Sequence, residues 1–275
     1  MTRIERFGWK HPVEPGIGRI VSAHGDYYHL VCNEAEGEIL ARKKKSAFMS
    51  PEVPRPITGD FVRFRYNAQG ESMIYEVLPR FSSFERKDPT ARRKAQTLAV
   101  NFDTLFIMMS HNENFSLPRL ERFLDLSEEC GEAEVVIVLT KKDLAAPGES
   151  GAVRVVTELG AKGMNVTALD LSCKTGEGLD AVRRYAQPGR TLAFIGSSGV
   201  GKSTLLNELA GEDWMATQEI QEWSGKGRHT TTSRELVMLP NGAMVIDTPG
   251  IREIGRVGEC DELLVKGEAS HRYRK

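Results

Sequence analysis

The fold is decided by the stretch Gly196-Ser197-Ser198-Gly199-Val200-Gly201-Lys202-Ser203, which fits the pattern G-x-x-x-x-G-K-[ST]. The apolar run 191–195 before it predicts a buried strand, and the run 204–209 after it predicts the first turns of a helix. Glycines let a backbone approach phosphate oxygens closely, and backbone N–H groups at a helix N-terminus attract their negative charge. The sequence therefore predicts a phosphate-binding loop between a strand and a helix of an α/β domain.

A second motif follows downstream, where an apolar strand ends in Asp247-Thr248-Pro249-Gly250. An aspartate at such a strand end suits an outer-shell contact to Mg²⁺. Between the two motifs lies Gly227-Arg228-His229-Thr230-Thr231-Thr232. A threonine run is usually a solvated loop, but its place between the motifs favours a switch threonine that closes over Mg²⁺ and a terminal phosphate. We expect Ser203 and Thr231 to ligate Mg²⁺ directly and Asp247 to support it.

Upstream of the loop, the apolar run 135–139 leads into Thr140-Lys141-Lys142-Asp143, which resembles the N-K-x-D motif of GTPases with threonine in place of asparagine. A carboxylate at Asp143 would accept hydrogen bonds from N1 and N2 of guanine, which adenine does not offer. A strand over 166–171 then leads into Ser172-Cys173-Lys174, which resembles the S-A-K motif. Taken alone, T-K-K-D is a strand-end loop with solvated lysines. The two motifs in the right relative order favour a guanine site over an ATPase site.

The order of these motifs is circularly permuted, because the base-reading motif precedes the phosphate loop. With a β-rich segment in front, the chain resembles the bacterial ribosome small subunit-dependent GTPase A (RsgA) family from about residue 16 to residue 255. The most specific pieces are Gly59-Asp60, the run 101–107, the phosphate loop and the run 227–232. The resemblance implies a cytoplasmic GTPase that takes GTP with Mg²⁺, acts in late assembly of the small ribosomal subunit, contacts its rRNA and is stimulated by it. The alternative is an RNA-binding or ribosome-binding module whose nucleotide site scarcely turns over.

Water positioning is the incomplete part of the predicted site. Many GTPases place a glutamine directly after the D-x-x-G motif, whereas Ile251 follows Gly250 here, and an aliphatic chain cannot orient water. We therefore predict slow GTP turnover without a partner. We predict that His229 positions the water once a partner orders the loop that contains this histidine. The alternative, to which we give equal weight, is that His229 is a surface histidine without a role in catalysis. Lys202 and Thr231 complete the predicted catalytic set. The predicted GTP-binding residues are Thr140, Lys141, Asp143, Ser172, Cys173, Lys174, Gly196, Ser197, Ser198, Gly199, Val200, Gly201, Lys202, Ser203, Thr204, Asp247 and Gly250.

We divide the chain near residue 97. Residues 1–97 contain short β-like runs typical of a small five-stranded barrel, with strands expected in 18–21, 27–31, 60–65 and 73–78, and the resemblance specifies an OB-fold. Residues 1–100 carry 17 Lys and Arg against 12 Asp and Glu, so this part is basic. We predict that a barrel loop contains the run Arg42-Lys43-Lys44-Lys45. Charge runs of this kind are usually solvated surface. On an OB-fold such a run favours RNA binding.

Residues 98–255 alternate strand-like and helix-like runs, which predicts a mostly parallel sheet with helices on both faces. Together with the motif order, the resemblance implies that this part is a circularly permuted P-loop GTPase domain. Members of the RsgA family usually end in a helical zinc-binding domain with three Cys and one His. Residues 256–275 of this chain contain only Cys260 and His271 of these residue types. Two ligands do not close a tetrahedral zinc site, so we expect a short tail without zinc. The predicted strands are 104–109, 135–139, 166–171, 191–195, 236–239 and 243–247.

Composition agrees with this interpretation. The 275 residues carry a formal net charge of −1 and suffice for two modest domains with cores of their own. No apolar run approaches the ~18 residues of a membrane span, and the first residues lack the apolar core of a signal peptide. The four cysteines are scattered without a C-x-x-C pair, which indicates cytoplasmic thiols rather than a disulfide framework. We expect a cytoplasmic monomer without membrane contact.

Overall fold

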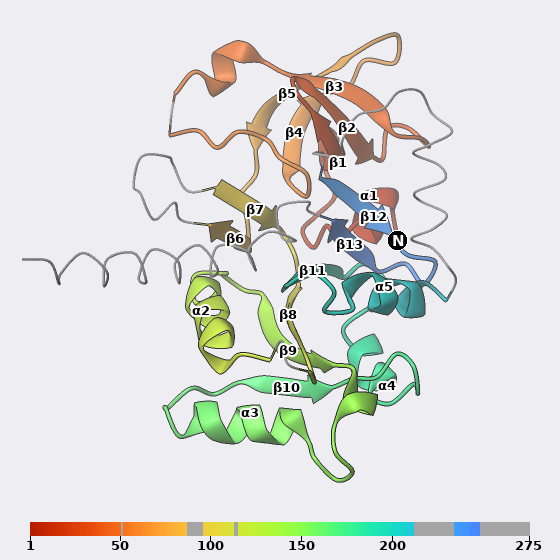
Figure 1. Ribbon diagram of the computed structural model, residues 1–275. Helices are drawn as coiled ribbons and strands as arrows, with labels where there is room; N and C mark the ends of the chain where they lie inside the picture. The colour runs from red at the N-terminus through yellow and green to blue at the C-terminus, as the bar shows by residue number, and fades with distance from the viewer. Residues whose placement is uncertain (51, 87–95, 113–114, 212–233, 248–275) are drawn as a thin grey trace, which may run out of the picture.

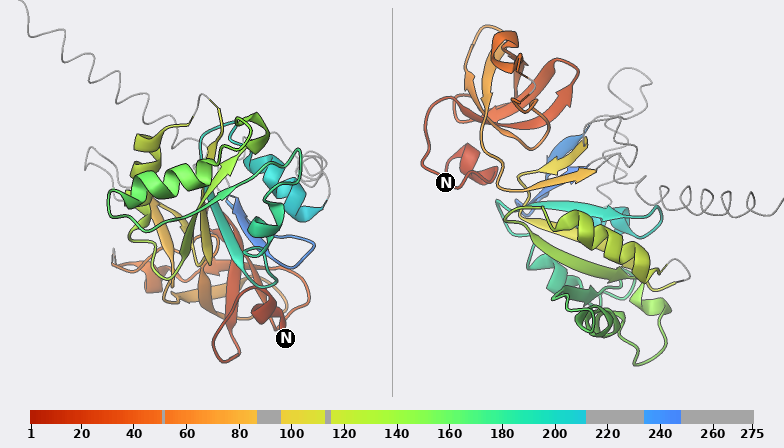
Figure 2. Two further views of the ribbon diagram at one scale, coloured as in Figure 1. Left: turned by 90° about the horizontal axis from the view of Figure 1, so that it is seen from below. Right: turned by 90° about the vertical axis from the view of Figure 1, so that its left-hand side faces the viewer.

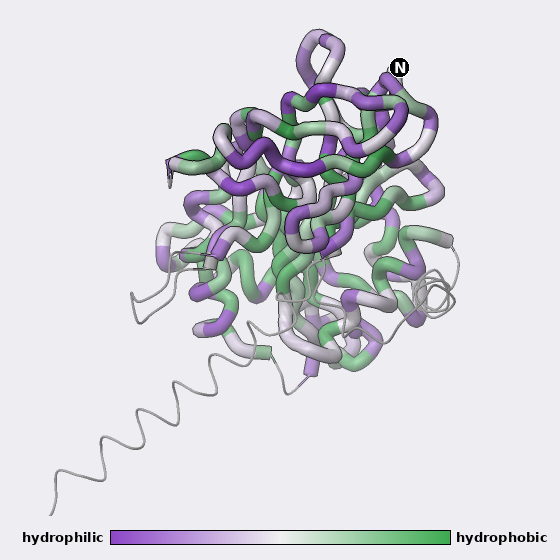
Figure 3. The backbone as a smooth tube through the Cα atoms, turned by 90° about the horizontal axis from the view of Figure 1, so that it is seen from above, coloured by the Kyte–Doolittle hydropathy of each residue, from purple (hydrophilic) through white to green (hydrophobic). Residues whose placement is uncertain are grey.

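The computed structural model describes residues 1–50, 52–86, 96–112, 115–211 and 234–247. It contains a β-barrel built from the N-terminal part of the chain and an α/β domain below it (Figure 1). Hydrophobic stretches of the backbone gather toward the middle of the molecule, with hydrophilic stretches around them (Figure 3). None of the helices in these ranges combines the length and the apolar character needed to cross a membrane.

The barrel has five strands, β1 (Ile17–His24), β2 (Tyr27–Cys32), β3 (Ile39–Lys43), β4 (Phe61–Arg65) and β5 (Ser72–Val77). They pair in the order β1-β2-β3-β5-β4, and β4 pairs back onto β1, which closes the barrel. Alternate residues of each strand point inward, because successive side chains of a strand face opposite sides. This closed barrel is consistent with the predicted OB-fold. Its buried core residues are Ile20, Tyr28, Leu30, Cys32, Ala41, Val62, Phe64 and Ile74.

The sequence predicted that the basic run 42–45 lies in a barrel loop, and this is correct only for Lys44 and Lys45, which follow β3. Arg42 and Lys43 form the end of β3, and Lys45 begins the 3₁₀ helix η1 (Lys45–Phe48). A strand rather than a loop forms here because Ala41 on the same strand is fully buried in the barrel core. The charged side chains of Arg42 and Lys43 are therefore held on a sheet surface.

Three further elements flank the barrel. A short helix, α1 (Arg3–Arg6), precedes it, and β6 (Ser83–Arg86) pairs antiparallel with β7 (Gln96–Val100) in a separate two-stranded sheet. The predicted division near residue 97 falls inside β7. The domain limits stay a prediction, and the predicted tail, 256–275, lies outside the described residues.

The α/β domain contains a six-stranded arrangement in the order β10-β9-β8-β11-β13-β12. Its strands are parallel except β12, which runs antiparallel to β13. Buried parallel strands are apolar on both faces, so their sequences read as continuous hydrophobic runs, and the predicted strands match the observed ones closely. The bounds are β8 Thr104–Ser110, β9 Glu134–Thr140, β10 Thr167–Asp170, β11 Thr191–Gly196, β12 Glu235–Met238 and β13 Met244–Asp247.

Helices cover both faces of this sheet, as predicted. Leu105 and Ile107 of β8 face one side and pack with α2 (Leu117–Ser127) and α3 (Gly151–Gly160). Phe106 and Met108 face the other side and pack with α4 (Leu179–Arg183) and α5 (Lys202–Ala210). A short 3₁₀ helix, η2 (Lys142–Leu144), follows β9. The chain visits β8, β9 and β10 before the central strand β11, which is the strand order that a circular permutation produces.

The barrel and the α/β domain share a continuous sheet, because β12 pairs antiparallel with β1 at Ser22 and Glu235. Figure 2 shows the β12–β13 hairpin between the barrel and the rest of the sheet. Beside this junction, Thr58 Oγ1 donates to the carbonyl of Arg234 at 2.8 Å. The Arg234 guanidinium donates in turn to the carbonyl of Thr97 at 2.5 Å.

Arg19 of β1 fills the centre of the junction and is only 1% exposed. Its guanidinium donates to the carbonyls of Phe7 at 2.6 Å and Asn101 at 2.7 Å. It also donates to the carbonyl of Gly59 at 3.3 Å and to Thr191 Oγ1 at 2.9 Å. One side chain of the barrel thus connects the N-terminal segment, the linker to β8 and the first residue of β11.

Candidate functional site

The predicted phosphate loop connects β11 to α5, as its motif requires. The loop leaves β11 at Gly196, where a Cβ would stand 2.7 Å from the Met108 carbonyl oxygen. Gly201 caps α5 with φ +100°, a conformation that L side chains rarely adopt. Ser198 and Gly199 are exposed at the tip, whereas Val200 is buried beneath it. The loop therefore presents its backbone to solvent and anchors itself through one apolar side chain.

The Lys202 ammonium lies over this loop. It donates to the carbonyl oxygens of Gly196 at 2.6 Å and Ser197 at 2.9 Å. Ser203 and Thr204 follow on the first turn of α5 and are exposed. A cation, exposed hydroxyls and a helix N-terminus at the end of a buried strand form an arrangement suited to a nucleotide polyphosphate.

The predicted base-reading residues lie on two loops at the same edge of the sheet. Asp143 lies in η2 directly after β9, and Ser172 follows β10. Ser172 Oγ donates to Asp143 Oδ1 at 2.7 Å, and this hydrogen bond lowers the pKa of the Asp143 carboxyl below its usual value. Ser172 is fully buried, whereas Asp143 is exposed. The result is an ionised acceptor of fixed direction at the surface, which is what recognition of the guanine N1 and N2 hydrogens requires.

Thr140, the last residue of β9, connects that strand to the phosphate loop. Its hydroxyl lies 2.5 Å from the carbonyl oxygen of Val200 and 3.1 Å from that of Met109, and the residue is 3% exposed. The hydroxyl therefore contacts the phosphate loop backbone. Lys141, the next residue, adopts a left-handed conformation with φ 59°, which turns the chain away from β9. The roles predicted for Thr140 and Lys141 at the base stay predictions.

Cys173, in the second base-reading loop, is a packing residue. It contacts the hydrophobic cluster under α4 and α5, and burial raises the pKa of its thiol to about 11. A thiol with this pKa stays protonated at neutral pH and is a poor nucleophile. Lys174 beside it is exposed.

Asp247 is the last residue of β13, the strand next to β11. It stands at the same edge of the sheet as the phosphate loop, because β11 and β13 are parallel and both end there. The predicted residues His229, Thr231 and Gly250, and with them the Ile251 position, lie outside the described residues. Their roles stay predictions.

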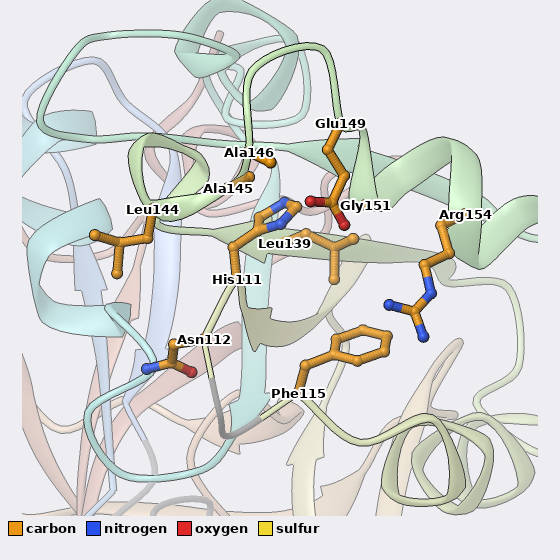
Figure 4. Close-up of a pocket in the computed structure, with 10 residues that line it drawn as sticks. All are labelled: His111, Asn112, Phe115, Leu139, Leu144, Ala145, Ala146, Glu149, Gly151 and Arg154. Atoms are coloured by element: carbon orange, nitrogen blue, oxygen red, sulfur yellow. The ribbon is translucent and has the colours of Figure 1, made fainter.

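A cavity of about 230 Å³ opens beside the predicted base-reading loop that contains Asp143 (Figure 4). Its inner wall carries His111, which directly follows β8, and its rim carries Arg154, whose guanidinium lies 5.3 Å from the centroid of the Phe115 ring. His111 Nε2 lies 2.7 Å from Asp170 Oδ1, at the end of β10. No sequence motif marks the His111–Asp170 pair. Only their positions in the sequence could have indicated them: His111 directly follows β8 and Asp170 ends β10, at the sheet edge that carries the predicted base-reading motifs.

The candidate RNA-binding run on the barrel, residues 42–45, contains two cations that form ion pairs and two that are exposed. Arg42 pairs with Glu71 at 2.8 Å, and its guanidinium lies 4.2 Å from the centroid of the Tyr27 ring. Lys43 pairs with Asp26 at 3.0 Å. Lys44 and Lys45 are both exposed beyond the end of β3. Within the predicted run these two lysines are the most accessible cations.

Comparisons with known proteins agree with this geometry. The sequence model described as RsgA GTPase matches residues 77–257. The chain is 41% identical to Small ribosomal subunit biogenesis GTPase RsgA 2 of Lactiplantibacillus plantarum, covering 86% of this chain and 66% of that protein. It is 36% identical to Small ribosomal subunit biogenesis GTPase RsgA of Leptospira interrogans, covering 93% of this chain and 72% of that protein. It thus spans about two thirds of the length of these relatives.

Two solved structures share the fold. The crystal structure of YjeQ from Thermotoga maritima superposes with a TM-score of 0.61 at 26% identity, covering 86% of this chain and 76% of that one. YloQ, described as a circularly permuted GTPase, superposes with a TM-score of 0.56 at 21% identity, covering 85% of this chain and 70% of that one. The circular permutation predicted from the motif order is confirmed at the level of the fold. By its sequence, by its strand order and by the residues gathered at one sheet edge, the chain belongs to the RsgA GTPase family.

Proposed function

We propose that this protein hydrolyses GTP during late maturation of the small ribosomal subunit and that binding of the subunit, through its rRNA, activates hydrolysis. The names of its relatives support the subunit as the partner. The observation that carries the proposal is the Ser172–Asp143 hydrogen bond of 2.7 Å at the edge where the phosphate loop lies. A carboxylate held in this way distinguishes guanine from adenine, because only guanine offers two adjacent donors. We place the protein in the cytoplasm and expect it to act as a monomer.

The described residues fit Mg²⁺ as the companion of GTP. Ser203 exposes a hydroxyl at the first turn of α5, and Asp247 ends the strand adjacent to β11. Among the residues that the structure describes, no group of three or more His, Cys, Asp or Glu side chains is placed to hold a metal ion. Mg²⁺ typically binds through few protein ligands together with nucleotide phosphates, where it neutralises phosphate charge. Ser203, with Thr231 from outside the described residues, would hold it directly, with Asp247 behind.

A phosphate-release assay distinguishes this function from its alternatives. GTP turnover should be slow for the protein alone and should rise when purified small subunits are added. A module that binds RNA or ribosomes but scarcely turns over GTP would show nucleotide binding without that rise. An ATPase would release phosphate from ATP as readily as from GTP.

The water-positioning role predicted for His229 gives the first mutational test. His229→Ala should leave GTP affinity nearly intact, because Lys202 and the loop backbone hold the phosphates. It should lower the subunit-stimulated rate about 100-fold, the scale of a positioned proton acceptor, and spare the slow basal rate. Single-turnover phosphate release with and without small subunits measures both rates.

Thr231→Ala serves as the comparison for His229→Ala. Loss of a Mg²⁺ ligand should weaken GTP-dependent ribosome binding itself, which His229→Ala should not. Full stimulation of the His229→Ala variant would show that the ribosome or the backbone positions the water.

The exposed lysines of the barrel give the second test. Lys44→Ala combined with Lys45→Ala should weaken subunit binding and flatten the dependence of log Kd on log salt by about 1–2, because each lysine that contacts a phosphate contributes ~0.7–0.9 to that slope. Adding Arg42→Ala and Lys43→Ala should have a smaller further effect, since both side chains already hold carboxylates.

Basal GTP hydrolysis should not change in these barrel variants. A matched control is Arg122→Ala with Arg184→Ala, which removes the same charge from two exposed positions of the α/β domain. An equal loss of subunit affinity in the control would show that only overall charge matters and that the barrel run is solvated surface.

A further inference from the structure

Asp170, the last residue of β10, gathers donors from two other segments of the α/β domain. Its Oδ1 lies 2.7 Å from His111 Nε2 and accepts the backbone N–H of Ala152 at 3.1 Å, while its Oδ2 accepts from Ser150 Oγ at 2.6 Å. The His111 and Asp170 side chains are 9% and 13% exposed. Burial opposes ionisation of Asp170, but the hydrogen bonds from Ser150 and His111 outweigh it and lower the pKa of the carboxyl. We call these four groups the Asp170 clamp.

The fold provides the space that the clamp needs. The His111 ring rests directly against Gly151, the first residue of α3, where any Cβ would collide with the ring and would stand 2.8 Å from Leu139 Cδ1. Figure 4 shows His111 and Gly151 side by side on the inner wall of the cavity. The backbone N–H of His111 donates to the Thr140 carbonyl at 2.8 Å, which fixes the residue beside the end of β9.

The clamp joins the ends of both base-reading loops. The loop that contains Asp143 ends where α3 begins, at Ser150 and Ala152, and both of these contact Asp170. The other loop begins directly after Asp170, and its Ser172 holds Asp143. The two loops are also tied by one backbone bond, from Lys142 N to Leu171 O at 3.0 Å. A change at Asp170 is therefore expected to alter the position of the Asp143 carboxylate relative to Ser172.

We propose that His111 and Asp170 are positioning residues for guanine recognition: the Asp170 clamp sets the direction of the Asp143 carboxylate and so sets the preference for bases that carry a 2-amino group. The proposal rests on the guanine-nucleotide site of the proposed function. Hydrogen bonds weaken steeply as their angle departs from linearity, so a small rotation of Asp143 affects recognition before it affects the fold. The phosphates are held separately by the loop after β11.

The test compares GDP with inosine diphosphate, which lacks the 2-amino group. The unmodified protein should prefer GDP, and this preference should fall about tenfold in Asp170→Ala and His111→Ala, the scale of one misaligned hydrogen bond to a charged group. KM for GTP should rise in both variants while kcat changes much less. Calorimetric or fluorescent titration of both nucleotides supplies the ratio.

Asp103 offers a matched control at the opposite end of the same sheet. Its side chain is 2% exposed and accepts from Lys10 at 2.6 Å, from Arg190 at 3.3 Å and from the Thr191 N–H at 2.8 Å. Asp103→Ala should lower stability but leave the GDP preference unchanged. An equal fall of the GDP preference in Asp103→Ala would overturn the proposal, because a general loss of stability of the α/β domain would then explain the effect of all three variants.

The cavity provides a rescue experiment. His111→Ala would extend the cavity of about 230 Å³ to Asp170, and millimolar imidazole could enter and donate to the carboxylate. Imidazole should restore the GDP preference of His111→Ala and not that of Asp170→Ala. An unchanged preference in folded His111→Ala and Asp170→Ala would refute the clamp, whereas failure of the unmodified protein to bind GDP would refute the proposed function instead.

Discussion

Asp143→Asn is expected to weaken GTP and GDP binding at least ~100-fold, because a pair of charge-assisted hydrogen bonds to the base is lost. The same change should improve binding of xanthosine triphosphate. Xanthine carries a carbonyl oxygen where guanine carries the 2-amino group, and the asparagine amide can donate to it. Titration of the variant with GTP and with xanthosine triphosphate measures how far its affinity shifts from the first nucleotide to the second. Phosphate release from xanthosine triphosphate shows whether the variant still hydrolyses a bound nucleotide.

Ser172→Ala is the companion variant. It removes the hydroxyl that holds Asp143 Oδ1 at 2.7 Å but keeps the carboxylate, so the loss of GTP affinity should be smaller and no preference for xanthine should appear. Equal affinity of the unmodified protein for ATP and GTP would contradict the guanine assignment altogether.

Arg19→Met is expected to reduce the free energy of unfolding by about 3 kcal/mol or more. The Phe7 and Asn101 carbonyls and the Thr191 hydroxyl lose their guanidinium donor, and each buried polar group left unpaired costs ~1–3 kcal/mol. Burial lowers the pKa of Arg19 only to about 10, so the side chain is charged at neutral pH and its bonds are charge-assisted. Urea unfolding of both proteins gives the difference.

Arg63→Met provides the control on the same barrel. Arg63 pairs with Glu14 at 3.1 Å and with Glu76 at 3.4 Å on the surface, where ion pairs contribute little to stability. Its free energy of unfolding should be almost unchanged. Unfolding of Arg19→Met at the same urea concentration as the unmodified protein would contradict this prediction. Solvent or neighbouring donors would then replace the guanidinium, and Arg19 would not be what joins the barrel to the α/β domain.

Local sequence patterns were sufficient for most elements of the α/β domain. The apolar runs of β8, β9 and β11 lie in a sheet buried on both faces, so their hydrophobicity alone predicts them. The barrel was harder to predict, and β3 was not identified. Its residues Ile39–Lys43 end in two cations, and the strand exists because Ala41 packs in a core formed by other strands.

The candidate site divides in the same way. The phosphate loop and the residues Asp143 and Ser172 could be located from short motifs, since each motif is contiguous and stands at a strand end. The hydrogen bond of the Thr140 hydroxyl to Val200, and the clamp around Asp170, could not be located from such motifs. Their partners are 60 and 59 residues apart in sequence for the Thr140–Val200 and His111–Asp170 pairs.

The sequence by itself determined the permuted order of the motifs, the parallel strands and the chemical groups that we propose read a guanine nucleotide. Only the tertiary structure decided which of these groups touch, where the basic run of the barrel lies, and that the buried Arg19 joins the barrel to the sheet. The physical reason is that backbone conformation and hydrophobic periodicity depend on near neighbours in the chain. Contacts between loops and between domains depend on strand order and register, which bring distant residues such as Arg19 and Thr191 together.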